Sequence, residues 1–329
     1  MMSYKSLSSG SGRVLIIGGK GRLGRVLTDY LQTKGYEVHA FVRSDSEPST
    51  QNVRSIEAAL VEQLQSTDVV LHLASTASSD RAVQEAVHID LTQGLLDAMA
   101  VAPPKHFIYF SSAKALAGEH STEQLSVDAH PQPTSHYGRF KLAAEQLIRG
   151  HPVTGSNACV TETTILRLPM VYGPGCAGNF DRLANLIRRG VPVPLARDNV
   201  RSLLFTENLC AYIGDLLAGS LLESPSRLPP QERLKTEGRG TRIVHLADSN
   251  PQPSAMLAQW MANSQHCVDR SLAISQKAGL LIAGLPLVGG YAMRLFGSLE
   301  LDTSSLGLWR APFSTEQGVE KTLSDDYPK

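Results

Sequence analysis

Short apolar runs alternate with amphipathic segments through the first two thirds of the chain. The apolar runs have the length and composition of buried strands. They cover Val14–Ile17, Val38–Val42, Asp68–Leu73, His106–Phe110 and Thr161–Leu166. Segments with helical periodicity separate or follow them, at Arg22–Thr33, Arg81–Ala100, His136–Arg149 and Glu207–Leu222. This alternation predicts a parallel sheet with crossover helices.

The pattern changes near Ser224. Pro225, Pro229 and Pro230, together with several charges, indicate an exposed insertion or linker. A further strand is expected over residues 242–246, and helices dominate from residue 251 onward. We therefore predict an α/β protein, a Rossmann doubly wound parallel sheet with a smaller, mostly helical C-terminal substrate lobe. The expected parts are a flexible leader at 1–12, an NAD(P)-binding domain at 13–170 and 200–247, and the substrate lobe at 171–199 and 248–329.

Composition excludes several classes of protein. The 329 residues are 42% hydrophobic and 19% charged with zero net charge, so no nucleic-acid partner is indicated. No Cys or His spacing typical of a metal site occurs, and residues 1–12 lack the apolar core of a signal peptide. Glycines and a proline interrupt the apolar stretch Ala278–Phe296, which predicts a buried or interface helix pair and no membrane span. We expect a cytoplasmic protein.

A glycine-rich segment follows the first expected strand. Residues 18–24 read GGKGRLG, so that Gly18, Gly21 and Gly24 are three residues apart. Between a strand and a helix, such a turn lets the backbone approach a pyrophosphate, and the helix N-terminus offers free N–H groups. The position of the motif therefore predicts a dinucleotide site.

The end of the second strand bears on which dinucleotide binds. Residues 41–44 read FVRS, and no acidic residue precedes Asp45. An acid at this place selects NAD through the ribose 2′-hydroxyl, whereas an arginine accommodates the 2′-phosphate of NADP. Arg43 favours NADP, although a solvated arginine that stacks on adenine without selecting fits the same sequence.

Tyr137 and Lys141 are four residues apart and share one face of the expected helix. A lysine ammonium beside a phenol favours the phenolate and lowers the pKa of the tyrosine, so Tyr137 is a candidate for proton transfer to or from a sugar hydroxyl or ketone. Ser112, at the end of the strand before this helix, is expected to polarise the same oxygen. Ser111 is expected to face the opposite side.

These motifs, in this order, resemble the extended short-chain dehydrogenase/reductase family, in particular its nucleotide-sugar epimerase/dehydratase branch. The resemblance extends from about Arg13 to Leu323. Residues 167–175, RLPMVYGPG, look like the family's Arg-Pro-x-x-Val-Tyr-Gly-Pro segment, and residues 308–312, LWRAP, look like its C-terminal Gly-Trp-x-Pro element.

The resemblance implies a set of site residues. Ser112, Tyr137 and Lys141 would be catalytic, and Asn179 and Arg201 would hold the substrate diphosphate. NAD or NADP would be bound by Gly18, Gly21, Arg22, Leu23, Gly24, Arg43, Leu73, Ala74, Tyr137 and Lys141. From the sequence alone, Asn179 fits the N-cap of a helix equally well. The resemblance further implies a nucleotide-sugar substrate, a homodimer, and a place in polysaccharide biosynthesis.

Two departures narrow the function. Ala113 and Lys114 stand where 4,6-dehydratases of the family carry an Asp-Glu pair, which argues against water elimination. Asp90 stands where the family has asparagine, and is expected to alter a hydrogen bond that supports the active site. The leading hypothesis is a UDP-sugar 4-epimerase. The alternatives are an NADPH-dependent 4-keto reductase of a nucleotide sugar and a non-catalytic NAD(P)-binding regulator.

Overall fold

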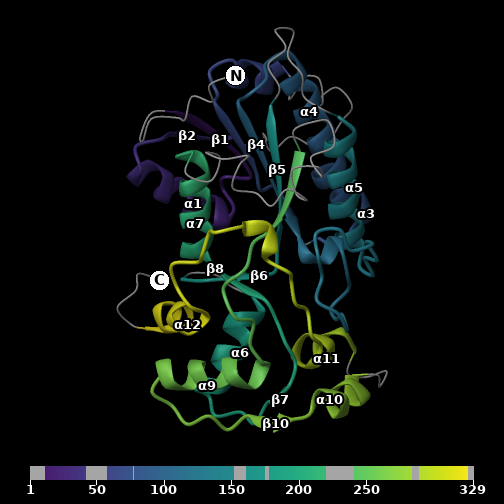
Figure 1. Cartoon of the computed structure of the whole chain (residues 1–329), viewed down its shortest axis with the longest axis vertical. Coiled ribbons are helices and arrows are strands. Elements are labelled where there is room, and N and C mark those ends of the chain that lie inside the picture. The colour runs from purple at the N-terminus through teal and green to yellow at the C-terminus, as the bar shows by residue number, and fades with distance from the viewer. Residues whose placement is uncertain are drawn as a thin grey trace. The chain divides into compact units, whose positions relative to one another are not determined.

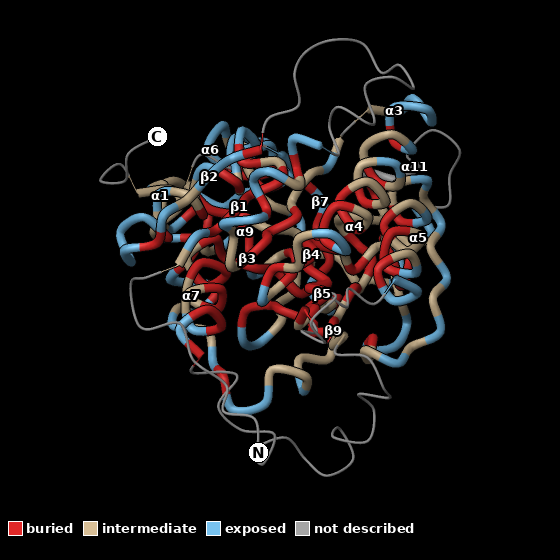
Figure 2. Tube along the Cα trace, turned by 90° about the horizontal axis from the view of Figure 1, so that it is seen from above, coloured by how far each residue is buried: buried red, intermediate tan, exposed pale blue. Residues whose placement is uncertain are grey.

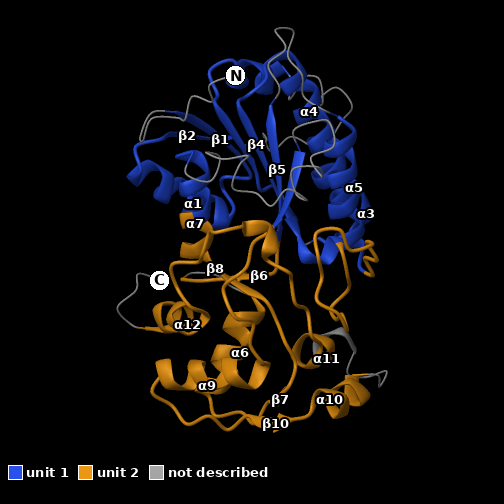
Figure 3. Cartoon of the chain, viewed as in Figure 1, with its two compact units in different colours: residues 1–115, 135–167, 212–244 blue, residues 116–134, 168–211, 245–329 orange. Residues whose placement is uncertain are grey.

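A computed structural model describes residues 12–41, 58–76, 78–151, 161–174, 178–219, 241–283 and 289–324 (Figure 1). Arg43, residues 1–11 of the leader expected at 1–12, and most of the expected insertion after Ser224 lie outside the described residues. The chain divides into two units, each built from three segments (Figure 3). Unit 1 comprises residues 1–115, 135–167 and 212–244, and unit 2 comprises residues 116–134, 168–211 and 245–329.

Unit 1 contains a six-stranded sheet in the order β2-β1-β3-β4-β5-β9. Its strands are β1 (Arg13–Ile17), β2 (Glu37–Phe41), β3 (Val69–His72), β4 (His106–Ser112), β5 (Glu162–Leu168) and β9 (Thr241–His245). The pairs β1–β2, β1–β3 and β3–β4 are parallel, which confirms the predicted α/β class. The chain leaves β1 toward β2 on one side and returns to β3 on the other, so the topological switch point lies between β1 and β3.

Helices cover both faces of this sheet. The helices of unit 1 are α1 (Arg22–Thr33), α3 (Arg81–Glu85), α4 (Leu91–Val101), α5 (His136–Gly150), residues 58–64 and the second half of α7 (Thr206–Leu217). Helices α4, α5 and 58–64 pack over one face, where Leu15, Val70, Phe107 and Tyr109 form the core with them. Figure 2 shows β1, β3, β4 and β5 as largely buried between the helix layers, whereas the edge strand β2 is mostly exposed. Burial on both faces explains why the strands read as continuous apolar runs rather than as alternating patterns.

The helix predicted over Arg81–Ala100 is not one regular helix. A π-helical turn, η1 (Ala86–Asp90), separates α3 from α4, and it carries the buried His88. A π-helical turn contains one more residue than an α-helical turn, so the side chains after it are rotated relative to a uniform 3.6-residue period. The sequence pattern did not reveal this change.

Unit 2 contains more strands than predicted. Its elements are β6 (Met170–Tyr172), α6 (Asn179–Arg188), β7 (Pro194–Ala196), β8 (Leu203–Phe205), the first half of α7, α9 (Ser254–Ser264), β10 (Leu272–Ile274), α10 (Gln276–Ala283), α11 (Gly289–Phe296) and α12 (Thr315–Leu323). The two-stranded sheets β6–β8 and β10–β7 were missed because strands of three residues are too short to show a period. Residues 116–134 and 200–211, predicted to belong to the nucleotide-binding domain, cluster with unit 2.

Asp248 joins several segments of unit 2. Its buried carboxylate accepts hydrogen bonds from the Phe205 N–H at 2.9 Å, Asn208 Nδ2 at 2.7 Å and the Tyr172 hydroxyl at 3.0 Å. Burial raises the pKa of Asp248 to about 6. These three donors hold β6, β8 and the start of α7 to the segment that follows β9.

The apolar stretch Ala278–Phe296 forms α10 and α11, and residues 284–288 between them lie outside the described part of the chain. Ala283, Ala292 and Phe296 lie in one buried cluster of unit 2, whereas Leu281 is 79% exposed. None of the described helices is long and apolar enough to cross a membrane.

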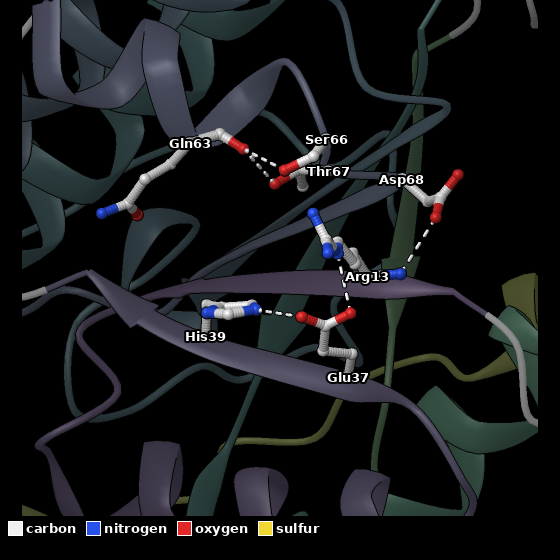
Figure 4. Close-up of polar contacts among 7 residues, drawn as sticks. All are labelled: Arg13, Glu37, His39, Gln63, Ser66, Thr67 and Asp68. Atoms are coloured by element: carbon white, nitrogen blue, oxygen red, sulfur yellow. Dashed lines mark hydrogen bonds and ion pairs between the residues drawn. The ribbon is translucent and has the colours of Figure 1, made fainter.

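Two ion pairs of unit 1 differ sharply in their surroundings. Arg167 on β5 and Glu145 on α5 form a buried bidentate pair, with Nη2–Oε2 at 2.7 Å and Nε–Oε1 at 3.0 Å. Arg13 on β1 and Glu37 on β2 form an exposed pair at 2.7 Å (Figure 4). In the same group of contacts, His39 lies 2.8 Å from Glu37, and the Arg13 main-chain N–H donates to Asp68 at 2.9 Å.

Breaking the buried pair should destabilise unit 1 far more than breaking the exposed one. Arg167→Met leaves the Glu145 carboxylate buried without its partner, so we expect it to lower the free energy of unfolding by about 3–5 kcal/mol. Arg13→Met is the matched control and should change stability little, because water solvates the remaining Glu37. Urea denaturation of both variants measures the difference. Equal losses would show that the buried pair stabilises the fold no more than the exposed pair does.

Candidate active site

The glycine turn lies at the switch point of the sheet. Gly18 has a φ of +93°, which favours glycine, and the Gly21 N–H donates to the Gly18 carbonyl at 3.0 Å. A Cβ at Gly18 would lie 2.8 Å from the Ala74 nitrogen, so the turn packs closely against the residues that follow β3. The Leu73 N–H donates to the Ile17 carbonyl at 2.9 Å and holds this loop to the end of β1.

These residues fit the pyrophosphate of a dinucleotide. Gly21 is the N-cap of α1 and therefore contributes no capping side chain. In α1, all of whose residues are described, the first turn carries no acidic side chain. The Arg22 and Leu23 positions at the helix start present main-chain N–H groups and the positive end of the helix dipole. The close approach of Gly24 to Gly18 brings helix and turn together, since a Cβ at Gly24 would lie 2.6 Å from the Gly18 oxygen.

Ser112 is the last residue of β4, and the Ser112 and Ser75 hydroxyls act to lower the pKa of the Tyr137 phenol against the effect of burial. Ser111 lies on the other side and donates to Glu145, which agrees with the expectation. Sequence reasoning missed Ser75, because a single serine in a loop of mixed composition carries no pattern.

Lys141 is buried beside Tyr137. Its Nζ donates to the Phe110 carbonyl at 2.8 Å and lies 6.0 Å from the centre of the Tyr137 ring. Burial lowers the pKa of Lys141 to about 7. The Tyr137–Lys141 pair therefore lies at the carboxyl end of β4, as its helical spacing indicates.

The expected lowering of the Tyr137 pKa is wrong for this state of the protein. Burial raises the pKa of Tyr137 above its ordinary value, and the hydrogen bonds of Ser75 and Ser112 act in the opposite direction. Lys141 does not produce the expected effect because its ammonium is itself destabilised by burial. Tyr137 is therefore a protonated phenol at neutral pH.

His88, and not Asp90, is the residue of the π-helical turn that reaches the candidate site. Asp90 is exposed, whereas the His88 ring contacts Tyr137 edge-on with centroids 5.7 Å apart and stacks on Phe140 at 6.4 Å. Neither ring nitrogen of His88 has a hydrogen-bond partner among the described residues. Burial lowers the pKa of His88 to about 4, so the ring is neutral. The expectation for Asp90 came from the family resemblance, which does not show which side chain of a π-helical turn faces the site.

The two residues predicted to bind a diphosphate lie in unit 2. Asn179 is the exposed first residue of α6, and the N-cap is Gly178, so the N-cap interpretation of Asn179 is wrong. Arg201 donates from Nη1 to the carbonyls of Gly297 at 2.7 Å and Glu119 at 3.2 Å. Burial lowers the pKa of Arg201 to about 10.

A second arginine accompanies Arg201. Arg294 forms an ion pair with Glu119 at 3.1 Å, and its charge acts on Arg201. Two guanidinium groups around one carboxylate leave a net positive charge, which favours an anionic ligand. Sequence reasoning missed Arg294, because it lies in the apolar stretch interpreted as a helix pair.

Comparison with known families decides the class of protein. The sequence model of the NAD dependent epimerase/dehydratase family matches residues 14–217, more than half of the chain. The chain belongs to this family. Membership confirms the resemblance drawn from the glycine turn and the Tyr137–Lys141 helix. The protein is accordingly an NAD(P)-dependent enzyme of the extended short-chain dehydrogenase/reductase type.

Individual proteins that resemble this member of the epimerase/dehydratase family have low sequence identity to it. The UDP-glucose 4-epimerase of Vibrio cholerae is 25% identical over 278 residues, which are 79% of this chain and 76% of that protein. The structure of UDP-N-acetylglucosamine 4-epimerase from Bacillus cereus superimposes with a TM-score of 0.67 at 19% identity, covering 94% of this chain and 98% of that one. The structure of dTDP-4-dehydrorhamnose reductase from Bacillus anthracis in complex with NADP gives a TM-score of 0.69 at 18% identity, covering 95% and 98%. The two structural similarities establish the shared fold.

Adding a methyl group inside the glycine turn should abolish dinucleotide binding. In Gly24→Ala, the new Cβ would lie 2.6 Å from both the Gly18 oxygen and the Gly19 Cα, which are backbone atoms that cannot rotate away. Gly94→Ala in α4 is the matched control, because a Cβ there meets no described atom within 4 Å. Titration calorimetry with NAD and NADP should show at least tenfold weaker binding for Gly24→Ala only. Unchanged binding by this variant would remove the glycine turn from the cofactor site.

Proposed function

We propose that this enzyme is a nucleotide-sugar 4-epimerase that acts on a UDP-sugar. The observation that carries the proposal is that the helix of Tyr137 and Lys141 is held to β4 by the hydrogen bond from Lys141 Nζ to the Phe110 carbonyl at 2.8 Å, on the strand that ends at Ser112. Family membership and the UDP-glucose 4-epimerase of Vibrio cholerae support the reaction class. The absence of the Asp-Glu pair at Ala113 and Lys114 argues against a dehydratase.

The residues have distinct roles in this proposal. A nicotinamide cofactor held at the glycine turn would supply the hydride chemistry at C4 of the sugar. Tyr137 removes the proton of the 4-hydroxyl and later returns it, and Ser112 donates a hydrogen bond to the same oxygen. Lys141 is held in place by its hydrogen bond to the Phe110 carbonyl and binds the cofactor ribose. When the Lys141 amine is protonated, its charge favours the ionised form of the Tyr137 phenol.

The substrate diphosphate is assigned to unit 2. Arg201 and Arg294 supply positive charge beside Glu119, and Asn179 presents an amide at the exposed start of α6. Guanidinium groups recognise phosphate oxygens through paired N–H donors, which supports this role for Arg201.

Two observations favour a second candidate, an NADPH-dependent 4-keto reductase of a nucleotide sugar. The protonated Tyr137 of this structure is a proton donor, the form that reduction of a ketone requires first. Arg43, with no acid before Asp45, suits the 2′-phosphate of NADP. A dTDP-4-dehydrorhamnose reductase of Mycolicibacterium smegmatis, 25% identical over 215 residues, shows that reductases occur among the relatives.

Replacing the phenol hydroxyl tests the assignment of Tyr137. Tyr137→Phe should lose at least about a hundredfold in turnover, the usual contribution of a general acid–base group, and retain dinucleotide affinity. Interconversion of UDP-glucose and UDP-galactose, or of their N-acetyl forms, is followed by chromatography. His136→Phe, at an exposed neighbouring position, is the control and should keep its activity. Full turnover by Tyr137→Phe would exclude Tyr137 as the proton-transfer residue.

The identity of the cofactor that is purified with the protein separates the two candidates. An epimerase regenerates its cofactor in each cycle, so we expect stoichiometric NAD after denaturation of protein prepared without added dinucleotide. Mass spectrometry of the released nucleotide measures this. NADP(H), or no retained dinucleotide, would favour the reductase and make Arg43 the residue that recognises the 2′-phosphate.

A further inference from the structure

Helix α10 of unit 2 is apolar on its exposed side as well as on its buried side. Gly279 and Ala283 are buried, and a Cβ at Gly279 would lie 2.3 Å from the Phe296 ring, so α10 packs closely on α11. Leu281, two residues after Gly279, lies on the opposite side of the helix and is 79% exposed, and Ile282 beside it is 40% exposed. A surface helix that faces water carries polar residues on its outer side. The outer side of α10 therefore has the composition of a surface that is covered.

The β7–β10 sheet extends this exposed apolar surface. In the parallel pairing, Leu272 lies opposite Pro194, and both are exposed. Val268, in the loop before β10, is 71% exposed. Strand β10 leads directly into α10, and the Gln276 N–H at the start of α10 donates to Asp198, just beyond β7. Figure 1 shows β7, β10 and α10 at the same end of unit 2. We call the following residues the β10–α10 surface: Val268, Leu272, Leu281 and Ile282.

Basic side chains flank the β10–α10 surface. Residues 186–198 and 268–282 carry five basic and two acidic side chains, and all seven are exposed. The basic residues are Arg188, Arg189, Arg197, Arg270 and Lys277, and the acidic residues are Asp198 and Asp269. The two segments lie side by side, because the Leu272 N–H donates to the Val193 carbonyl and the Arg197 N–H donates to the Ile274 carbonyl, both at 2.9 Å. The whole chain has zero net charge, so the positive charge here is a local excess.

We propose that the β10–α10 surface binds to a membrane that is rich in anionic phospholipid. Apolar side chains enter the boundary between headgroups and acyl chains, and the flanking Arg and Lys side chains reach the lipid phosphates. With eight residues, α10 is too short to cross a bilayer, so it lies in the plane of the interface. The inference concerns unit 2 alone and does not depend on the proposed reaction.

Charge favours a lipid surface over a second copy of this chain. A symmetric pair of copies would use the same patch on both sides, so the basic residues of one copy would face those of the other. Like charges placed across an interface weaken binding. An anionic bilayer instead attracts all five basic side chains at once, and clusters of this size are typical of anionic-lipid recognition.

The experiment measures the binding of the full chain to lipid vesicles by co-sedimentation. We expect the protein to bind vesicles of equal parts phosphatidylglycerol and phosphatidylcholine, and not vesicles of phosphatidylcholine alone. Leu281→Ser should weaken this binding about tenfold, because a large apolar side chain no longer enters the bilayer. Arg270→Gln and Lys277→Gln should each weaken it about fivefold, because each removes one attraction to the lipid phosphates.

Leu308→Ser is the matched control. Leu308 is 77% exposed in unit 2, nearly as much as Leu281, but it follows Ser305, whose hydroxyl accepts a hydrogen bond from the His245 N–H. This variant should bind vesicles like the unaltered protein. Thermal unfolding of each variant at the temperature of the unaltered protein would show that the fold is intact. If Leu281→Ser unfolds earlier, Ile282→Ser replaces it in the comparison.

Three outcomes would overturn the inference. The first is that the protein does not bind the anionic vesicles. The second is that Leu281→Ser binds them as well as Leu308→Ser does, since charge alone would then account for the binding. The third is self-association of the chain that Leu281→Ser abolishes, without vesicle binding, which would assign the surface to a second copy. The assay contains neither dinucleotide nor nucleotide sugar, so its result is independent of the proposed function.

Discussion

A single buried carboxylate fixes the helix that carries the candidate catalytic residues. Glu145 follows Tyr137 and Lys141 at successive four-residue steps on α5, and it binds Arg167 of β5 and Ser111 of β4 at once. The helix cannot rotate or slide along the sheet without leaving a charge unpaired in the interior, which is costly. The position of the candidate catalytic tyrosine over the sheet therefore depends on this buried ion pair.

Much of the nucleotide-binding unit could be predicted from the sequence because most of its strands are short, continuous apolar runs separated by segments with helical periodicity. The glycine turn was predictable for the same reason, since its spacing has one physical use between a strand and a helix. The three-residue strands of unit 2 were not predictable, because their pairing is decided by contacts between Leu272–Ile274 and Pro194–Ala196, far apart in sequence. Likewise, residues 116–134 belong to unit 2 through pairing such as that of Leu125 with Leu301.

The residues of the candidate site could be predicted where their spacing along the chain brings them together. They could not be predicted where only the tertiary structure does so. Tyr137 and Lys141 share a helix face, so four residues of sequence are sufficient to group them. His88 joins them only through a π-helical turn that shifts the helix phase, which no sequence spacing shows. The direction of the Tyr137 pKa was beyond sequence reasoning as well. It is the difference between a burial penalty and two hydrogen bonds, and neither quantity is visible in a motif.

The interleaving of the two units has a consequence for how the chain is made. Unit 1 receives its last segment only when residue 244 has been synthesised, and unit 2 still needs residues 245–329 after that. A growing chain therefore carries the first strands of the sheet, with apolar edges, while their final neighbour β9 is still missing. The order of synthesis favours early collapse around β1, β3 and β4, whose partners are close in sequence, and late closure of everything else. Neither unit is a continuous stretch of sequence. We therefore expect recombination between genes to transfer the two units together and not one at a time.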